Sequence, residues 1–262
     1  MIIDFHVHAF PDEVAPRAIE ALFSAYHMPP ATDGTVGDLT AKIEAAGIDY
    51  ALIQPVATSQ AQVRSINDWA AGHTHPTILS FGGMHPDYED VQGEVDRIIS
   101  LGLKGIKIQG NFQNVCIDSP DMYPIYEAAQ GRLIMLFHTG AEVAPIVDEK
   151  ATPKRLAKIH KDFPNLTIVA AHMGGYLMWD ESEEYLVGKN IYLDTSACFP
   201  KLISDARLLS MIRNHGTDRI LFASDIPLGN PQTELSHIRR IGLNDNELEM
   251  VLGGNAKRLL GL

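Results

Sequence analysis

The amino-acid sequence predicts a single α/β domain that folds as a closed (β/α)8 barrel, the TIM-barrel architecture. Eight short apolar runs alternate along the chain with stretches of helical periodicity, which is the order of parallel βαβ units. These runs are nearly continuous in apolar residues, as expected of strands that are covered on both faces. The 262 residues match the length of one such barrel, and no linker or second core is evident, so residues 1–262 are expected to form one domain.

The strands are expected where apolar residues cluster between turn-forming residues. They fall at residues 1–8, 50–55, 78–83, 103–108, 133–138, 166–171, 191–194 and 219–223. Helices are expected where apolar residues recur with a period of about 3.6. They fall at about residues 11–26, 36–46, 65–72, 91–101, 152–163, 202–214 and 244–260. The helix at 152–163 carries the clearest boundaries, because Thr152 can cap it, Pro153 suits its first turn and Pro164 ends it.

The composition restricts the partners of the protein. The net charge is -12, and no run of lysines and arginines is present to follow a phosphate backbone, which argues against nucleic acid and anionic membranes. No apolar stretch reaches the roughly 20 residues that span a bilayer, and removal of a signal peptide would delete His6 and His8. Cys116 and Cys198 suggest neither a metal motif nor a disulfide framework. We therefore expect a cytoplasmic protein that acts on a small molecule; a homo-oligomer stays open.

Residues with metal-binding or acid–base capacity follow several of the predicted strands. His6 and His8, two positions apart, end the first strand and can face the same way. His138 ends the fifth strand, His172 follows the sixth, and Asp225 lies just past the eighth. The active site of such a barrel lies at the carboxyl ends of its strands, so these side chains are expected to meet. Six other histidines are expected to have no catalytic part: His27, His73, His75, His160, His215 and His237.

Each of these residues also has an ordinary structural interpretation. His138 or His172 alone could be a buried histidine bonded to a backbone carbonyl, and Asp225 could cap the next helix. The repeated order of apolar run, histidine and small residues favours a site instead. Imidazole and carboxylate together suit one divalent ion, with Zn²⁺ expected first and Mn²⁺ as the alternative. A catalytic zinc keeps one position for water, and His172 could then move protons.

Six segments resemble the amidohydrolase superfamily, within its amidohydrolase-related branch that includes aminocarboxymuconate-semialdehyde decarboxylase-like proteins. They are residues 3–8 (IDFHVH), 104–108 (KGIKI), 137–140 (FHTG), 171–175 (AHMGG), 222–225 (FASD) and 253–260 (GGNAKRLL). The resemblance covers essentially the whole chain and implies a barrel of the metallo-dependent hydrolase type. It implies His6, His8, His138 and Asp225 as metal ligands, with His172 and Asp225 as the catalytic residues.

The resemblance leaves the reaction open. In hydrolytic members the aspartate takes a proton from a metal-activated water; in decarboxylating members the metal holds substrate oxygens while an acid–base pair protonates the carbon that loses CO2. The short chain favours a hydrolase of a small amide or lactone, with a non-oxidative decarboxylase of a small carboxylated substrate as the alternative. A TatD-like nuclease also starts with His-x-His, but the acidic balance opposes it. A metal-free binding protein on the same fold is the remaining alternative.

Two further residues are expected near the site. Lys107 lies in the fourth strand with its direction undetermined; we favour a contact with a substrate carboxylate or a buried ion pair. In binuclear members of the superfamily a lysine of this strand is carboxylated and bridges two metals. Asp4 has the parity of His6 and His8 and could accept a hydrogen bond from a ligand or be purely structural. Tyr176 and Trp179 could form an apolar lid or a packed loop.

Overall fold

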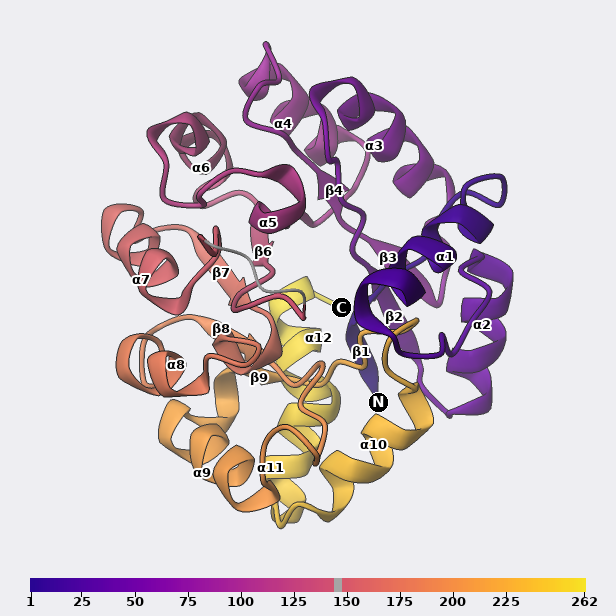
Figure 1. The fold of residues 1–262 in the computed structure, drawn as a ribbon, viewed down its shortest axis with the longest axis vertical. Coiled ribbons are helices and arrows are strands. Elements are labelled where there is room, and N and C mark those ends of the chain that lie inside the picture. Colours follow the sequence, from indigo (N-terminus) through magenta and orange to yellow (C-terminus); the bar gives the residue numbers. More distant parts are fainter. Residues whose placement is uncertain (144–147) are drawn as a thin grey trace.

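The computed structural model describes residues 1–143 and 148–262 and has parallel strands surrounded by helices (Figure 1). The strands are β1 (Ile3–Val7), β2 (Tyr50–Ile53), β3 (Ile78–Ser80), β4 (Gly82–Gly83), β5 (Gly105–Ile108), β6 (Ile134–Phe137), β7 (Thr167–Ala170), β8 (Tyr192–Asp194) and β9 (Ile220–Leu221). Consecutive strands pair in parallel in two sheets, β1-β2-β3 and β4 to β9. The strand predicted at residues 78–83 corresponds to β3 and β4, which are separated by Phe81 alone.

Backbone hydrogen bonds join these two sheets into a ring. Phe81, which lies between β3 and β4, donates its N–H to Ile53 O of β2 at 3.0 Å, a distance typical of a β-ladder. At the other junction Phe5 N donates to Phe222 O, and Asp225 N donates to His6 O, each at 2.9 Å. The last strand is therefore bonded to the first, and the eight predicted strands form the predicted (β/α)8 barrel.

Helices cover the outside of this ring. They are α1 (Ala15–Tyr26), α2 (Val36–Ala45), α3 (Val63–Gly72), α4 (Val91–Ser100), α5 (Gly110–Gln113), α6 (Tyr123–Ala129), α7 (Pro153–Asp162), α8 (Trp179–Tyr185), α9 (Asp205–His215), α10 (Pro231–Arg240), α11 (Asp245–Glu249) and α12 (Asn255–Leu260). The predicted boundaries of α7 are confirmed, because the Thr152 side chain accepts from Arg155 N and Pro153 is the first residue. No helix in the described part of the chain is both long and apolar enough to cross a membrane.

The predicted helix at residues 244–260 is interrupted. A π-helical turn, Met250–Gly254, separates α11 from α12. Gly253 lies against the start of the chain, where a Cβ atom would come within 2.3 Å of the Met1 carbonyl oxygen. The wider turn therefore lets the chain pass the amino terminus. The helices α5, α6, α8 and α10 were not expected from the sequence.

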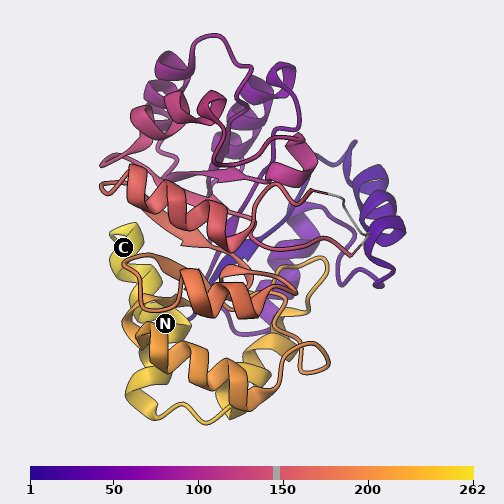
Figure 2. The ribbon, with the colours of Figure 1, turned by 60° about the vertical axis from the view of Figure 1, so that its left-hand side comes forward.

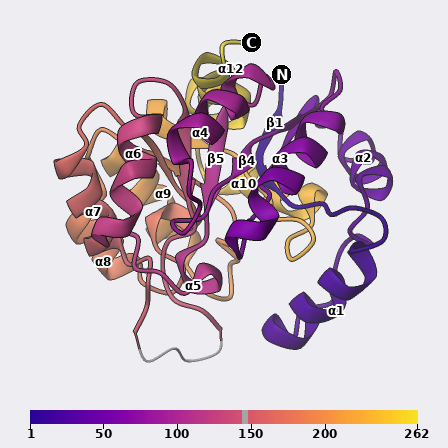
Figure 3. The ribbon, with the colours of Figure 1, turned by 90° about the horizontal axis from the view of Figure 1, so that it is seen from above.

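Two buried clusters fill the protein. The larger cluster joins outward-facing strand residues to the helices, for example Ile53 and Ile106 to Leu39 of α2 and Ile98 of α4. The smaller cluster joins residues of β1, β2, β6, β7 and β9 to α12 and to no other helix, so it is the interior of the barrel. Figures 2 and 3 show α12 and both chain termini together at one end of the barrel. In Figure 3, α1 and α5 lie at the opposite end, where the strands finish.

Strand β1 contains a bulge that changes which side chains face inward. Asp4 pairs with Ala51 and Val7 with Ile53, so three steps along β1 match two along β2. As a result Phe5 belongs to the inner cluster and Val7 to the outer one, although both have odd positions. The parity of residue numbers therefore does not tell which side of β1 a side chain faces, because a bulge shifts the alternation by one residue.

Candidate metal centre

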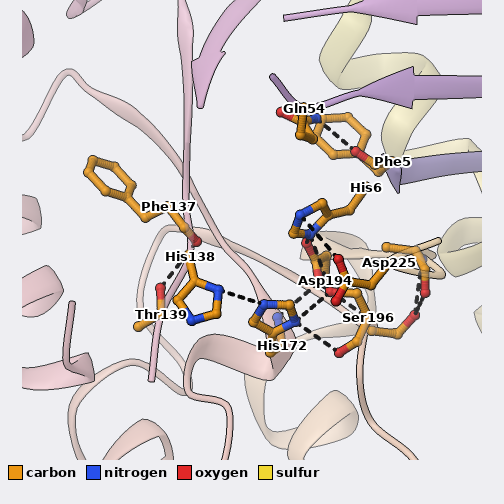
Figure 4. A network of polar contacts seen from close by, with 12 residues as sticks. Phe5, His6, Gln54, Phe137, His138, Thr139, His172, Asp194, Ser196 and Asp225 are labelled. Atoms are coloured by element: carbon orange, nitrogen blue, oxygen red, sulfur yellow. Dashed lines mark hydrogen bonds and ion pairs between the residues drawn. The ribbon is translucent and has the colours of Figure 1, made fainter. Parts of the chain in front are cut away.

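His6 and His8 each have one ring nitrogen held by an oxygen behind the site. His6 Nδ1 lies 3.0 Å from Asp194 Oδ2, and His8 Nδ1 lies 2.9 Å from the Gln54 carbonyl oxygen (Figure 4 shows His6 and Asp194). Both oxygens act as acceptors, so Nδ1 carries the hydrogen in each ring and Nε2 keeps its lone pair. This is the arrangement that metal-binding histidines usually have.

Asp225 completes a group with these two Nε2 atoms. Its Oδ1 lies 3.3 Å from His8 Nε2 and 3.7 Å from His6 Nε2. Ligands that bind one ion at about 2.0–2.2 Å are separated from one another by roughly 3–4 Å, so these spacings suit a shared cation. Asp225 has a left-handed backbone conformation, with φ of +59°, which aspartate tolerates better than most residues. Its N–H bonds to His6 O, which fixes the loop to β1.

His138 and His172 lie together beside this group. His172 Nε2 is 3.0 Å from His138 Nδ1, and the two ring centroids are 4.8 Å apart. Within the described part of the chain, two sets of at least three residues have ligating atoms within 4.8 Å of one another: His6, His8 and Asp225, and His6, His172 and Asp194. His138 belongs to neither set. The structure thus brings three of the four expected ligands into one group and places the fourth against His172.

Burial determines the protonation states of these side chains. Burial, and then the nearby charge of Lys107, holds the pKa of His6 well below its usual range and lowers the pKa of His138 to about 3. Burial, and then His138, lowers the pKa of His172 to about 4. Burial alone would raise the pKa of Asp225, but its contacts with His8 and His6 outweigh it and hold that pKa well below its usual range. Near neutral pH the site therefore offers neutral imidazoles and a carboxylate.

These donors fit a divalent ion. Zn²⁺ and Mn²⁺ require neutral imidazole and ionised carboxylate ligands, which is the state that burial produces here. His138 Nε2 is buried and has no hydrogen-bond partner among the described residues, while Glu142 Oε1 lies 3.4 Å from it. The lone pair of His138 Nε2 then has no hydrogen-bond donor and faces a carboxylate, which is unfavourable. A nearby cation would stabilise both the lone pair and the Glu142 carboxylate. The observation supports a cation at this mouth of the barrel.

Lys107 points into the barrel, which resolves the direction that the sequence left open. Its side chain is buried, and its Nζ lies 2.9 Å from His6 Nε2. Burial lowers the pKa of Lys107 to about 8, although Asp225, Asp194 and Glu142 act in the opposite direction. The ammonium group therefore stands directly beside the candidate ligands.

The other expected site residues have supporting contacts. Asp4 Oδ1 accepts from Ser224 N at 2.9 Å and from His6 N at 3.4 Å, so it holds the backbone of both ligand segments. Trp179 donates its Nε1 hydrogen to His172 O at 3.1 Å, and the Tyr176 ring lies 5.9 Å from the His172 ring. Both aromatic side chains are buried, so they pack against His172 instead of forming an exposed lid.

Two residues of the site were not expected from the sequence. Asp194, at the end of β8, contacts His6, and Ser196 Oγ lies 2.8 Å from His172 Nδ1. The position of Asp194 at a strand end was the same signal that indicated His138. Nothing comparable marks Ser196, because its contact depends on the loop after β8, in which Ala197 has a φ of +52°. Two of the six histidines expected to have no catalytic part form structural hydrogen bonds. His215 Nε2 bonds to Ile191 O and His237 Nε2 to Asp205 Oδ1, each at 2.9 Å.

The comparisons with known proteins agree with this architecture. The profile of a family described as Amidohydrolase matches residues 3–262. A comparison with curated proteins found no match. Among solved structures, 5-carboxyvanillate decarboxylase from Sphingomonas paucimobilis is similar with a TM-score of 0.77 and 20% sequence identity, over 100% of this chain and 99% of that chain.

Two further solved structures have the same fold. The 2,6-dihydroxybenzoate decarboxylase from Rhizobium has a TM-score of 0.73 and 18% identity, over 99% of this chain and 98% of that chain. The 5-carboxyvanillate decarboxylase from Novosphingobium aromaticivorans, complexed with manganese and 4-hydroxy-3-methoxy-5-nitrobenzoic acid, has a TM-score of 0.78 and 18% identity, over 100% of this chain and 96% of that chain. At these identities the similarity establishes the shared fold.

Proposed function

The chain belongs to the amidohydrolase family, and from that premise we propose that it is a metal-dependent, non-oxidative decarboxylase of a small hydroxylated aromatic acid. His6, His8, His138 and Asp225 would hold one divalent cation, with Mn²⁺ and Zn²⁺ as the two candidates. Manganese is named for the Novosphingobium aromaticivorans structure described above, and small aromatic acids are named as the substrates of all three neighbours described. These names support the proposal, which reverses the preference for hydrolysis drawn from chain length.

The observation that carries the proposal is the ammonium group of Lys107, buried 2.9 Å from His6 Nε2. An anionic substrate with a carboxylate and a neighbouring hydroxyl group can bind two positive centres at once, the cation and Lys107. A neutral amide or lactone would gain no charge pairing from the second centre. The charge arrangement therefore favours a carboxylated substrate.

The residues of this chain would divide the reaction among them. When bound, the cation would supply a Lewis acid that holds and polarises substrate oxygens. Lys107 would pair with the substrate carboxylate. A proton taken up at His172 Nε2 would pass to the ring carbon that carries the carboxylate, forming a C–H bond as the C–C bond breaks. The electron pair of the broken C–C bond stays on the ring and forms the C–H bond with the proton. CO2 leaves, and no water is consumed.

A direct assay tests this function. Protein stripped of metal and reloaded with Mn²⁺ or Zn²⁺ is incubated with 2,6-dihydroxybenzoate, 5-carboxyvanillate and a panel of small hydroxylated benzoates in D2O. We expect release of CO2 and one deuterium at the vacated ring carbon, with His172→Asn as the inactive, metal-loaded control. No CO2 from any of these acids, together with hydrolysis of an amide or lactone that incorporates ¹⁸O from labelled water, would overturn the proposal.

Hydrolysis is the second candidate, and the position of Asp225 is the observation that favours it, because its Oδ1 lies 3.3 Å from His8 Nε2 and 3.7 Å from His6 Nε2. A carboxylate next to the cation could take the proton of an attacking water and pass it to the leaving group. Lys107→Met separates the two reactions. For a decarboxylase of an anionic substrate, we expect KM to rise about 10- to 100-fold, because the substrate loses one charged hydrogen bond. For a hydrolase of a neutral substrate, KM should stay within twofold.

A further inference from the structure

Asp194 is a buried carboxylate at the carboxyl end of β8, and both of its oxygens are used inside the candidate site. Its Oδ2 lies 3.0 Å from His6 Nδ1. Its Oδ1 accepts from the backbone N–H of His172 at 2.9 Å and of Ser196 at 3.1 Å (Figure 4). The Ser196 hydroxyl also donates to Oδ1. One carboxylate thus touches a candidate metal ligand and the loop that carries the candidate proton carrier.

The contact with Oδ2 determines which nitrogen of His6 can bind a cation. A carboxylate oxygen accepts the hydrogen of Nδ1, so the lone pair remains on Nε2, which faces Asp225 at 3.7 Å. His8 receives the same constraint from a different group, the carbonyl oxygen of Gln54. His6 depends on a side chain for this constraint, so a single substitution can remove it.

The contact with Oδ1 reaches the His172 ring through Ser196. Because the Ser196 hydroxyl gives its hydrogen to Asp194, its oxygen is free to accept from His172 Nδ1, which lies 2.8 Å away. The Ser196 carbonyl oxygen, 3.3 Å from the same nitrogen, can only accept. His172 is therefore held with its hydrogen on Nδ1 and its lone pair on Nε2. The backbone of His172, with a φ of +60°, is held in place by its own bond to Asp194.

We propose that Asp194 is a positioning residue shared by His6 and His172, which it holds directly and through Ser196 respectively, so that each ring keeps its hydrogen on Nδ1 and its lone pair on Nε2. The inference rests on the proposed function for the roles of the two histidines. Asp194, His6 and His172 also have ligating atoms within 4.8 Å of one another. Each Asp194 oxygen already accepts hydrogen from N–H or O–H donors, however, which assigns it a supporting role instead of a place among the ligands.

The first test compares Asp194→Asn with the wild type in Zn²⁺ titrations and in long-range ¹H–¹⁵N spectra of the imidazole rings. An asparagine can keep the acceptor toward His172 N but turns an NH2 group toward His6 Nδ1. We expect His6 to change to the form with hydrogen on Nε2 in the metal-free protein, and Zn²⁺ affinity to fall about 10- to 100-fold. Unchanged affinity together with an unchanged His6 spectrum would overturn the proposal.

The second test uses Ser196→Ala, which removes the link to the His172 ring and a longer contact of 3.3 Å with His6 Nδ1, and leaves the 3.0 Å bond between Asp194 and His6. We expect the His172 spectrum to change from the Nδ1-protonated form to a mixture of both forms, with Zn²⁺ affinity within twofold of the wild type. Ser80→Ala is the matched control, because Ser80 is also buried but its hydroxyl bonds to the carbonyls of Phe81 and Ile53. An unchanged His172 spectrum, or a loss of affinity equal to that of Asp194→Asn, would contradict the division of roles.

These outcomes separate the inference from the proposed function. If the wild type binds no Zn²⁺, the proposed metal site fails, while the spectra of metal-free protein still test whether Asp194 and Ser196 position the two rings. If the wild type binds Zn²⁺ and Asp194→Asn binds it equally well, only the inference fails. Should Asp194→Asn not fold, Asp194→Ala is measured in its place, with the same loss of affinity expected and an unchanged affinity contradicting the proposal.

Discussion

The chemistry of the candidate site depends on which nitrogen of each imidazole carries hydrogen. Carbonyl and carboxylate oxygens behind the site accept from Nδ1 of His6 and His8, so their lone pairs are on Nε2, where a cation could bind. His172 has the same form, but its Nε2 faces another histidine, His138. Residues of one type thus have different expected roles, which single substitutions can separate.

Replacing a candidate ligand and replacing the candidate proton carrier should have different effects. We expect Asp225→Asn to lower bound metal by at least about tenfold, because an amide is a much weaker ligand than a carboxylate. We expect His172→Asn to keep its metal and lose about 10²- to 10⁴-fold in turnover, the usual contribution of acid–base catalysis. Metal analysis and kinetics on the same preparations check this. Full metal occupancy in Asp225→Asn would contradict the ligand assignment.

A second buried carboxyl group gives a prediction about pH. Glu234 of α10 is 4% exposed, and burial, together with the charge of Asp225, raises its pKa to about 7 from 4.5. Between these values the unfolded chain ionises while the folded protein holds the proton, so Glu234 lowers stability increasingly as pH rises from about 4.5 to 7. This destabilisation is absent below about pH 4.5 and complete above about pH 7.

Glu234→Gln should therefore stabilise the protein more at pH 8 than at pH 5. We expect the gains in unfolding free energy at the two pH values to differ by about 2–3 kcal/mol, measured by urea denaturation. The pH-independent effect of burying an amide cancels in this difference. Glu249→Gln, at an exposed position, is the control and should show no difference. Equal gains for Glu234→Gln at both pH values would show that Glu234 is ionised throughout.

At the level of elements, the close approach of neighbouring strands limits which residues they can contain. A Cβ atom on Gly105 of β5 would lie 2.4 Å from the Ile134 carbonyl oxygen and 2.6 Å from the Phe81 ring. These contacts involve backbone and a packed core side chain, neither of which can move away freely. Gly72, the last residue of α3, has no atom within 4 Å of the same position.

Two glycine substitutions test this difference. We expect Gly105→Ala to lower the unfolding free energy by about 3 kcal/mol or more, in the range of severe overpacking of a core. We expect Gly72→Ala to be neutral or to stabilise by up to about 1 kcal/mol, because alanine favours the helix. Thermal and urea denaturation measure both. A Gly105→Ala protein as stable as the wild type would mean that β5 and β6 can separate without loss.

The sequence predicted the strands well and some helices poorly, for reasons visible in particular elements. The strands are continuous apolar runs, so their number and order were evident. Helix α6 has only seven residues and includes Pro124, too few for a periodic pattern. Helix α10 has a capping Asn230 followed by Pro231, but few apolar residues follow them, so the boundary signal was overlooked. The bulge in β1 leaves no pattern in composition.

The candidate site was predictable where it depended on strand ends and not where it depended on loops. The position at a strand end identified His138, and it applied equally to Asp194, which was overlooked. The contacts of Ser196 and Glu142 require loop conformations that sequence does not reveal. The preference for hydrolysis drawn from the short chain has no support, because this chain aligns with 96% to 99% of the decarboxylases compared with it.

For the molecule as a whole, the candidate ligands come from opposite ends of the chain. His6 lies in β1 and His8 directly follows it, whereas Asp225 follows β9, so a bound cation would connect the first and last strands. Removing metal with a chelator should lower Tm by about 5–10 °C, as expected for binding at about 100 times Kd in a protein of this size. Calorimetry measures it, and His6→Ala should show no such shift. An equal shift in His6→Ala would place the metal elsewhere.

The hydrogen bonds from Phe5 to Phe222 and from Asp225 to His6 also impose an order on biosynthesis. The first strand leaves the ribosome long before the segment that will bond to its free side, so that side has no strand beside it for most of translation. During this period the nascent chain holds His6 and His8 without Asp225. A site that includes both β1 and Asp225 can therefore form only in the last part of translation, after the residues of the earlier βα units have been made.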